Sequence, residues 1–398
     1  MSGSDKLRAL VVDDSAYNRR TITSMLHGQP GVEVVGRAIN GKEALRMAFN
    51  LRPDVITLDL EMPEMDGFSF LRLLMSKQPT PVLVVSSYSQ RENVFRALEL
   101  GALDFIAKPT REVSPDIRNI EHDLRQKIEI VRKLQVVRLR ERAQSLAGLD
   151  RTFSAEPTHP SAGEPTNRPA GEPTSHRAAE PPSRSPSEPT SHRAAEPPPQ
   201  GTPARRAIAV AASTGGPPAV QQVLCALPAD LPAAILVAQH MPARFTKAFA
   251  DRLNRLVPMR VVEAQDGLPV EEGTVYIAPG SGNLEVSGSA GNARVRIVPP
   301  TKPARSGPVI TPSGDHLFKS LAGVFGVDLC AVVLTGMGSD GREGCRVAKE
   351  HGARVYAEDP DSAVMPGMPH SVIEAGLEDR IVAIESLATA LLEFCHPR

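Results

Sequence analysis

Short apolar runs alternate with amphipathic, helix-length segments over residues 7 to about 112. The apolar runs predict buried strands, and the segments between them repeat apolar side chains every three or four residues, as helices do. The expected strands are 7–14, 32–38, 54–60, 81–87 and 102–108, and the expected helices are 16–28, 41–51, 66–77 and 91–101. This alternation indicates a parallel sheet covered on both faces. Five such strands suit an α/β, flavodoxin-like doubly wound fold, which binds ligands at the strand carboxyl ends.

The same rhythm returns from residue 205 and predicts a second doubly wound parallel α/β domain over 205–398. The expected strands are 207–213, 233–239, 260–264, 274–279, 294–299, 330–338 and 353–359, and the expected helices are 220–228, 244–256, 316–326 and 341–352. A hairpin is expected within 274–298, where two strand-like runs flank a glycine-rich segment. The segment is long enough to bury a core of its own.

The chain between these domains changes character twice. Apolar residues recur every three or four positions from about 116 to 134, amid many charges, so we place the first domain at 7–125 and an amphipathic helix at 126–150. This pattern leaves three placements open: closing the first domain, lying between the domains, or pairing in a dimer. Residues 151–204 are rich in Pro, Ser and Glu, and EPTSHRAAEPP occurs at both 172–182 and 188–198. We expect a disordered, proline-rich linker, in which His159, His176 and His192 are solvated rather than metal-bound.

Composition narrows the class of protein. The chain has 398 residues, which favours two domains, and a formal net charge of −1, which argues against a nucleic-acid partner. No apolar run reaches the roughly 20 residues of a membrane span, and the N-terminus lacks a signal-peptide core. The four cysteines form no CxxC pair, so we expect buried thiols and a cytoplasmic protein without membrane insertion.

Acidic residues end two of the first-domain strands, and a lysine follows a third. Asp13 and Asp14 follow one apolar run, Asp59 ends another, and Lys108 precedes Pro109 after the last. Strand-end aspartates can simply cap the next helix. Acids at the ends of different strands favour a site instead, in which carboxylates hold Mg²⁺ and Asp59 accepts a phosphoryl group. Lys108 and Ser86 would then contact the added phosphate.

A second candidate site follows three strands of the C-terminal domain. Ser213 lies in a tight glycine-containing turn before a helix, whose N–H groups can stabilise an oxyanion. The turn resembles a nucleophile elbow, with Ala211 in place of the first glycine, but it equally suits phosphate binding or tight packing. His240 and Asp340 each follow another apolar run. Together they supply the base and the orienting acid that a serine nucleophile requires.

The first-domain motifs resemble the receiver domain of bacterial response regulators. The Asp-Asp pair, the aspartate before xxMPxMDG, the Ser-Ser after the fourth strand and the Lys-Pro occur in the same order. The resemblance implies that Asp59 is phosphorylated and that Asp13, Asp14 and Asp59 bind Mg²⁺. It also implies that Ser86 and Phe105 act with Lys108 as switch residues.

The whole chain outside the linker resembles the CheB family of chemotaxis protein-glutamate methylesterases, through ASTGG, QHMP, TVYIAPG and LTGMGSDG. The resemblance implies removal of methyl groups from glutamate esters on chemoreceptor helices and deamidation of receptor glutamines. Ser213 would be the nucleophile, His240 the base and Asp340 its orienter, with no cofactor for hydrolysis. Thr214 and Met337 would flank the site, and an N–H near Met337 would serve the oxyanion hole. The implied partners are a chemotaxis histidine kinase and methyl-accepting chemoreceptors.

Two hypotheses of different class follow. In the first, the chain is a phosphorylation-activated serine hydrolase, which the receiver domain restrains until Asp59 is phosphorylated. In the second, it is a response regulator without enzymatic activity, whose C-terminal domain only binds a partner. Reaction of Ser213 with a serine-directed phosphonate separates them. We expect the segment with Asp315 and His316 to begin a helix near the cleft, and His370 to lie in a loop at its rim.

Overall fold

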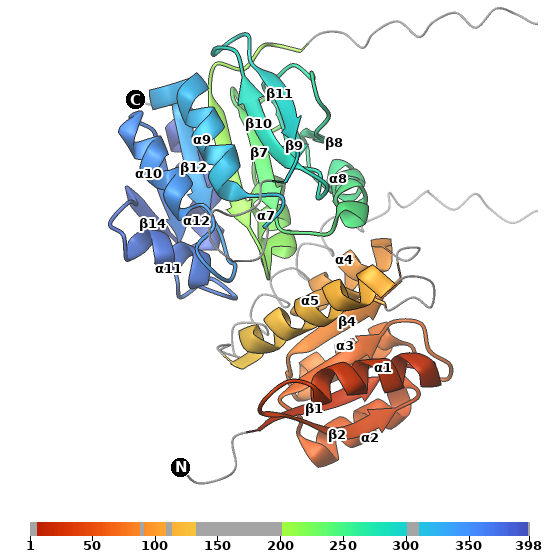
Figure 1. The fold of residues 1–398 in the computed structure, drawn as a ribbon. Coiled ribbons are helices and arrows are strands. Elements are labelled where there is room, and N and C mark those ends of the chain that lie inside the picture. Colours follow the sequence, from red (N-terminus) through yellow and green to blue (C-terminus); the bar gives the residue numbers. More distant parts are fainter. Residues whose placement is uncertain (1–5, 88–90, 109–113, 133–200, 301–309, 397–398) are drawn as a thin grey trace, which may run out of the picture.

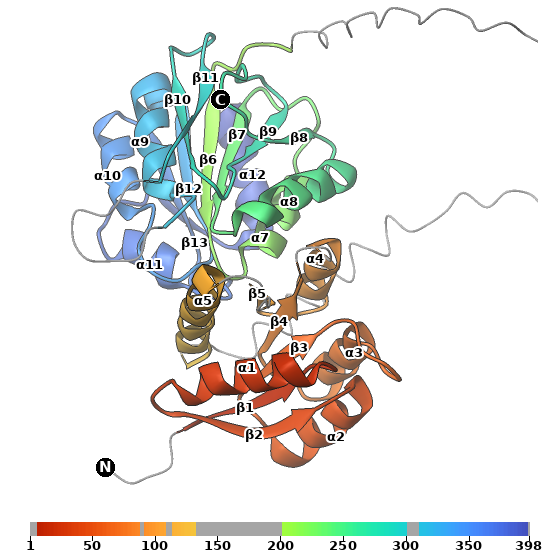
Figure 2. The ribbon, with the colours of Figure 1, turned by 45° about the vertical axis from the view of Figure 1, so that its right-hand side comes forward.

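A computed structural model describes residues 6–87, 91–108, 114–132, 201–300 and 310–396. These residues form two α/β units that pack against each other (Figures 1 and 2). The predicted linker up to residue 200 and the predicted helix 126–150 beyond Arg132 lie outside the described residues, as do His159, His176 and His192.

The N-terminal unit has one parallel five-stranded sheet in the order β2-β1-β3-β4-β5, which confirms the predicted flavodoxin-like fold. Its strands are β1 (Leu7–Val12), β2 (Val32–Ala38), β3 (Val55–Asp59), β4 (Val82–Ser86) and β5 (Asp104–Ala107). Its helices are α1 (Ala16–His27), α2 (Gly41–Leu51), α3 (Gly67–Lys77), α4 (Arg91–Glu99) and α5 (Ser114–Arg132). Ser15, Asn40 and Asp66 cap the first three helices through side-chain oxygens, which fixes where those helices begin.

The C-terminal unit has a parallel seven-stranded sheet in the order β14-β13-β12-β6-β7-β9-β8. Its strands are β6 (Ala207–Ala212), β7 (Ala234–Gln239), β8 (Arg260–Glu263), β9 (Thr274–Ile277), β12 (Leu329–Val333), β13 (Arg354–Glu358) and β14 (Arg380–Val382). Its α-helices are α7 (Gly216–Cys225), α8 (Ala243–Leu256), α9 (Gly314–Phe325), α10 (Arg342–Glu350), α11 (Gly367–Ile373) and α12 (Ile384–Cys395), and a short 3₁₀ helix spans Gly326–Asp328. The expected hairpin is a separate antiparallel pair of β10 (Asn283–Ser287) and β11 (Arg294–Val298).

Helix α5 closes the first unit and also reaches the second. Leu124 and Ile128 are buried in an apolar cluster with β1, β4 and β5, and the same cluster contains Val364 and Met365 of the C-terminal unit. Both views place α5 between the two sheets (Figures 1 and 2). A second apolar cluster also runs across both units. The two domains therefore meet along a packed interface.

The four cysteines are free thiols, three of them buried and Cys225 half-buried. Burial raises the pKa of Cys225 and raises that of Cys395 to about 11, which keeps these thiols protonated at neutral pH. Among the helices of the described residues, none combines the length and apolarity needed to cross a bilayer.

Candidate functional site

Both candidate sites lie where the order of the strands reverses, so that the chain begins to add strands on the other side of its first strand. In the N-terminal unit the chain leaves β1 toward β2 and then returns to add β3 on the other side of β1. In the C-terminal unit it adds β7, β8 and β9 on one side of β6 and then β12 on the other. The carboxyl ends of strands at such a reversal frame a crevice that binds ligands. Asp13 and Asp59 lie at the first reversal, and Ser213 and Asp340 follow the central strands of the second.

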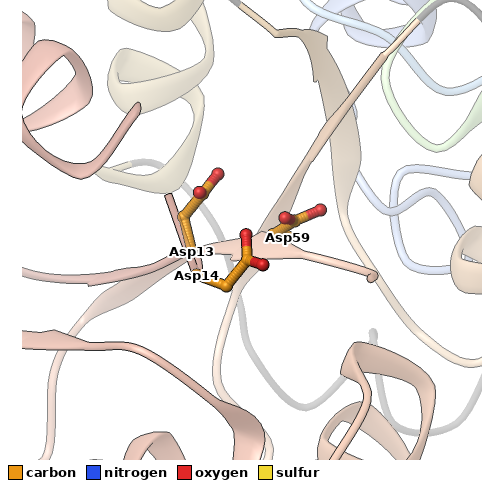
Figure 3. Close-up of side chains that lie close together, drawn as sticks. All are labelled: Asp13, Asp14 and Asp59. Atoms are coloured by element: carbon orange, nitrogen blue, oxygen red, sulfur yellow. The ribbon is translucent and has the colours of Figure 1, made fainter. Parts of the chain in front are cut away.

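The three aspartates of the N-terminal unit lie close together at the ends of two strands (Figure 3). Carboxylate oxygens of Asp13, Asp14 and Asp59 all lie within 4.8 Å of one another. Asp13 and Asp59 are buried, whereas Asp14 is exposed. Lys108 reaches this cluster from the end of β5, with its Nζ 2.6 Å from Asp59 Oδ2 and 3.8 Å from Asp13 Oδ2. The structure thus brings together four residues that the sequence had placed on three strands.

The charge balance of this cluster fits a divalent cation. Burial and the nearby charge of Asp59 raise the pKa of Asp13 to about 6. Burial also raises the pKa of Asp59, although Lys108 partly offsets that rise. One ammonium group therefore faces three carboxylates, two of which are poorly solvated. Hard oxygen ligands of this kind suit Mg²⁺, with Asp13, Asp14 and Asp59 as the residues that would hold it.

Of the predicted switch residues, Ser86 lies beside this cluster, whereas Phe105 faces the other domain. Ser86, at the end of β4, is fully buried, and its hydroxyl donates to the carbonyl of Ser87 at 3.3 Å. The ring of Phe105 on β5 is buried against Phe245 of α8, with ring centroids 4.6 Å apart. Phe105 therefore contacts the other domain directly, only three positions before Lys108.

The turn that carries Ser213 depends on its two glycines. Gly215 has a φ of +76°, and a Cβ there would lie 2.8 Å from Val364. A Cβ on Gly216 would lie 2.1 Å from the amide oxygen of Gln239. The Gly216 N–H donates to the Ser213 carbonyl at 2.8 Å, and the next two residues are prolines without an N–H. The first turn of α7 is therefore a poorer oxyanion donor than its position suggested.

His240 and Asp340 form a close pair beside Ser213. Ala212 pairs with Gln239 across β6 and β7, so Ser213 and His240 are the residues that directly follow paired positions. His240 Nε2 lies 2.7 Å from Asp340 Oδ2. This contact leaves Nδ1 as the imidazole nitrogen available to a nucleophile.

Asp340 lies in the loop between β12 and α10. Its carboxylate is placed at the N-terminus of α9 and accepts several further hydrogen bonds there. Its donors are the Ser313 hydroxyl at 2.8 Å, the Gly314 N–H at 2.6 Å and the Asp315 N–H at 3.1 Å. Burial alone would raise the pKa of Asp340, but His240 and these donors lower it to about 2. The carboxylate therefore stays ionised at neutral pH and holds the imidazole in one orientation.

Sequence reasoning missed two residues that support this pair. Gln239 donates its amide to the carbonyls of Ser213 and His240, at 2.9 and 3.1 Å, and so ties the two strand ends together. Ser313 both caps α9 and donates to Asp340. The available signal for Gln239 was a polar residue at the end of an apolar strand. The signal for Ser313 was a serine three residues before His316, which is typical of a helix N-cap. The structure places Asp315 in the first turn of α9 as expected, but it places His370 in α11 rather than in a loop.

Thr214 and the loop that carries Met337 lie next to Ser213. A Cβ on Gly336 would lie 2.7 Å from the Ser213 Cβ, so the loop that carries Met337 passes directly over the serine. The Thr214 hydroxyl donates to Asp104 Oδ2 at 2.6 Å, across the domain interface. Lys127 of α5 holds the other carboxylate oxygen of Asp104 at 2.8 Å. Strand β5 thus contacts the Ser213 turn at one end and carries Lys108 just beyond the other.

Comparison with known proteins gives consistent matches over the whole chain. A family model described as CheB methylesterase matches residues 208–391, and one described as response regulator receiver domain matches residues 9–114. Protein-glutamate methylesterase/protein-glutamine glutaminase 3 of Geobacter sulfurreducens is 43% identical over 394 residues, 98% of each chain. Protein-glutamate methylesterase/protein-glutamine glutaminase 1 of Myxococcus xanthus is 40% identical over 398 residues, 100% of each chain. The crystal structure of the Thermotoga maritima CheB methylesterase catalytic domain is 36% identical and covers 47% of this chain and 97% of its own, with a TM-score of 0.45.

Proposed function

The chain belongs to the CheB methylesterase family, and we propose that it hydrolyses glutamate methyl esters on chemoreceptors under the control of phosphorylation at Asp59. It also deamidates receptor glutamines, the second activity in the names of its relatives. The observation that carries the proposal is the His240–Asp340 pair at 2.7 Å, directly beside the strand end that bears Ser213. The chain works in the cytoplasm, where the signalling ends of chemoreceptors and a histidine kinase phosphodonor are available to it.

The hydrolysis needs only groups of this chain. His240 accepts the hydroxyl proton at Nδ1 while Ser213 Oγ attacks the ester carbonyl, and an N–H of the Met337 loop stabilises the oxyanion. The protonated imidazole then gives its proton to the methoxy oxygen, and methanol leaves an acyl-serine. A water molecule, deprotonated by His240, hydrolyses this ester and restores Ser213. The low pKa of Asp340 favours the imidazolium that forms twice in the cycle.

Control by the receiver domain follows from the contacts of β5. With Asp59 unphosphorylated, Lys108 pairs with Asp59 and Asp104 accepts the hydrogen bond of Thr214, next to the nucleophile. Mg²⁺, when bound to the aspartates, neutralises charge at the acceptor. Phosphorylation gives Lys108 and Ser86 a dianionic partner, which moves β5 and releases the Thr214 turn.

Two assays separate a hydrolase from a binding module. Methanol release from methylated receptor membranes is measured with the wild-type chain and with Ser213→Ala. We expect the variant to fall to background while its thermal unfolding stays unchanged. A serine-directed phosphonate is expected to label the wild-type chain at Ser213. Release by Ser213→Ala at the wild-type rate, or no labelling together with no release, would contradict the proposal.

A further inference from the structure

Helix α8 of the catalytic domain presents one aromatic and two basic side chains to helix α4 of the receiver domain. Phe249 stacks on Phe95, with ring centroids 5.3 Å apart. Arg252 pairs with Glu99, and Arg255 Nη2 lies 3.1 Å from Glu92 Oε1. The aromatic contact is fully buried, whereas the Arg255–Glu92 pair is about half exposed. The catalytic domain thus has a basic, aromatic helix face, which we call the α8 face and define by Phe249, Arg252 and Arg255.

Helix α4 occupies the α8 face with regularly spaced side chains. Glu92, Phe95 and Glu99 lie at positions i, i+3 and i+7 of α4, on one side of that helix. This is the anchor spacing with which an amphipathic helix binds a groove. The α8 face therefore already holds an acidic helix with one apolar anchor between two carboxylates.

The fit of α4 leaves part of the α8 face unused. The Nε of Arg252 is buried and has no hydrogen-bond partner within the described residues. Guanidinium groups bind carboxylates most strongly through two parallel N–H donors. The receiver glutamate thus engages Arg252 through one N–H donor and leaves its Nε donor without a partner there.

The α8 face is also continuous with the catalytic centre. Helix α8 begins three residues after His240, and its first turn contacts β5 through Phe245. The α4 helix covers the α8 face in the same closed state in which Asp104 engages Thr214. A substrate helix could therefore contact the α8 face only after α4 has left it.

We propose that the α8 face binds an acidic helical segment of the chemoreceptor close to the ester, and that α4 occupies the same face in the resting protein. This proposal rests on the function proposed above. The bound segment carries two carboxylates that flank an apolar side chain at the spacing of Glu92, Phe95 and Glu99. Receiver and substrate then compete for Arg252 and Arg255, so that phosphorylation uncovers a recognition surface together with the nucleophile.

The test compares charge reversal on the two sides of the same ion pairs, in the phosphorylated full-length chain. In Arg252→Glu/Arg255→Glu we expect the KM for methylated receptor membranes to rise about tenfold, or roughly 1.4 kcal/mol, while kcat changes little. The matched control, Glu92→Lys/Glu99→Lys, breaks the same contacts from the receiver side. It is expected to raise activity without phosphorylation but to leave the KM of the phosphorylated chain unchanged.

Two further readouts keep the outcome clear. Turnover of a small chromogenic ester should be the same in all phosphorylated variants, because it does not use the α8 face. Arg255→Glu alone, at a half-exposed position, should raise KM and weaken its dependence on salt without loss of fold. An unchanged KM in the α8 variants, or an equal rise in the α4 control, would overturn the inference. Absence of methanol release from the wild-type chain would instead count against the proposed function.

Discussion

Asp340 and Asp13 are both buried carboxylates just beyond the carboxyl ends of central strands, yet the pKa of Asp340 is lowered to about 2 and that of Asp13 is raised to about 6. The difference lies in what surrounds them. The Asp340 carboxylate pairs with His240 and accepts hydrogen bonds from the Ser313 hydroxyl and from two N–H groups of α9. Asp13 faces Asp59, and its donors are Asn18, the Ser15 N–H and the more distant Lys108.

This contrast separates a carboxylate whose charge the protein itself compensates from a carboxylate cluster whose charges it compensates only in part. The Asp340 carboxylate is ionised and held in place by groups of the protein, as the proposed role of orienting His240 requires. The receiver carboxylates repel one another and are poorly solvated, so positive charge from outside stabilises them. The following experiments alter the Asp340 site, the receiver carboxylates or the domain contact between them.

The largest effect is expected for Asp340→Asn. The amide keeps the size of the side chain but cannot favour the imidazolium, so kcat should fall about 10³- to 10⁴-fold. Methanol release from receptor membranes measures the change. Phosphorylation of Asp59 in the same variant, followed by intact mass, should be normal. Loss of phosphorylation as well would mean that the two sites are not separate.

A smaller loss is expected when one donor to Asp340 is removed. Ser313→Ala deletes a buried hydroxyl hydrogen bond to a charged acceptor, and kcat should fall about tenfold. Ser313→Thr keeps the hydroxyl and should restore most of the activity. If Ser313→Ala and Ser313→Thr are equally impaired, packing rather than the hydrogen bond determines the effect.

The same donors give a pH dependence of stability. The folded pKa of Asp340 lies below its ordinary value of 3.8, so its stabilising contribution is present above about pH 4 and is lost as pH falls through about 2. That contribution is on the order of 2 kcal/mol. Acid unfolding of Ser313→Ala, followed by circular dichroism, should begin at higher pH than in the wild-type chain. An unchanged acid transition would show that Ser313 does not help to lower this pKa.

A several-fold gain is expected when the domain contact is weakened from the receiver side. Asp104→Ala removes the acceptor of the Thr214 hydroxyl without touching the catalytic domain. Unphosphorylated methanol release should rise about three- to tenfold, and the phosphorylated rate should stay at the wild-type value. A fall in both rates would show that Asp104 supports the Ser213 turn rather than restrains it.

The smallest effect concerns Mg²⁺. Mg²⁺ is expected to bind the folded receiver domain and not the unfolded chain. Saturating Mg²⁺ near neutral pH should therefore raise the unfolding temperature of the receiver domain by a few degrees. Asp13→Asn should lose most of this shift, and it should itself be more stable than the wild-type chain without Mg²⁺, because a repelling charge is gone. An equal shift in both chains would place the ion elsewhere.

The sequence predicted the two sheets, and it allowed the candidate residues of both sites to be grouped, because the information there is local. Strands such as β3, β4, β6 and β7 are buried throughout and appear as unbroken apolar runs. Residues that follow parallel strands share one sheet edge, so the functional side chains could be grouped without coordinates.

What escaped prediction depends on contacts between distant segments. Strand β14 has only three residues and exposes Ile381, so it lacks a strand pattern. Ser313 meets Asp340 only because α9 points at the end of β12, and Asp104 meets Thr214 only because the domains dock. We also expected N–H groups of α7 to stabilise an oxyanion, which was wrong because Pro217 and Pro218 in its first turn have no N–H.

In the proposed function, the phosphorylation state of Asp59 sets the activity of the Ser213 site. The most direct test is methanol release from methylated receptor membranes by the full-length chain and by Asp59→Asn, each with and without a small-molecule phosphodonor and Mg²⁺. We expect the phosphodonor to raise the wild-type rate at least tenfold and to leave the Asp59→Asn rate at its basal value. Equal rates with and without phosphodonor in the wild-type chain, or equal stimulation of Asp59→Asn, would contradict it.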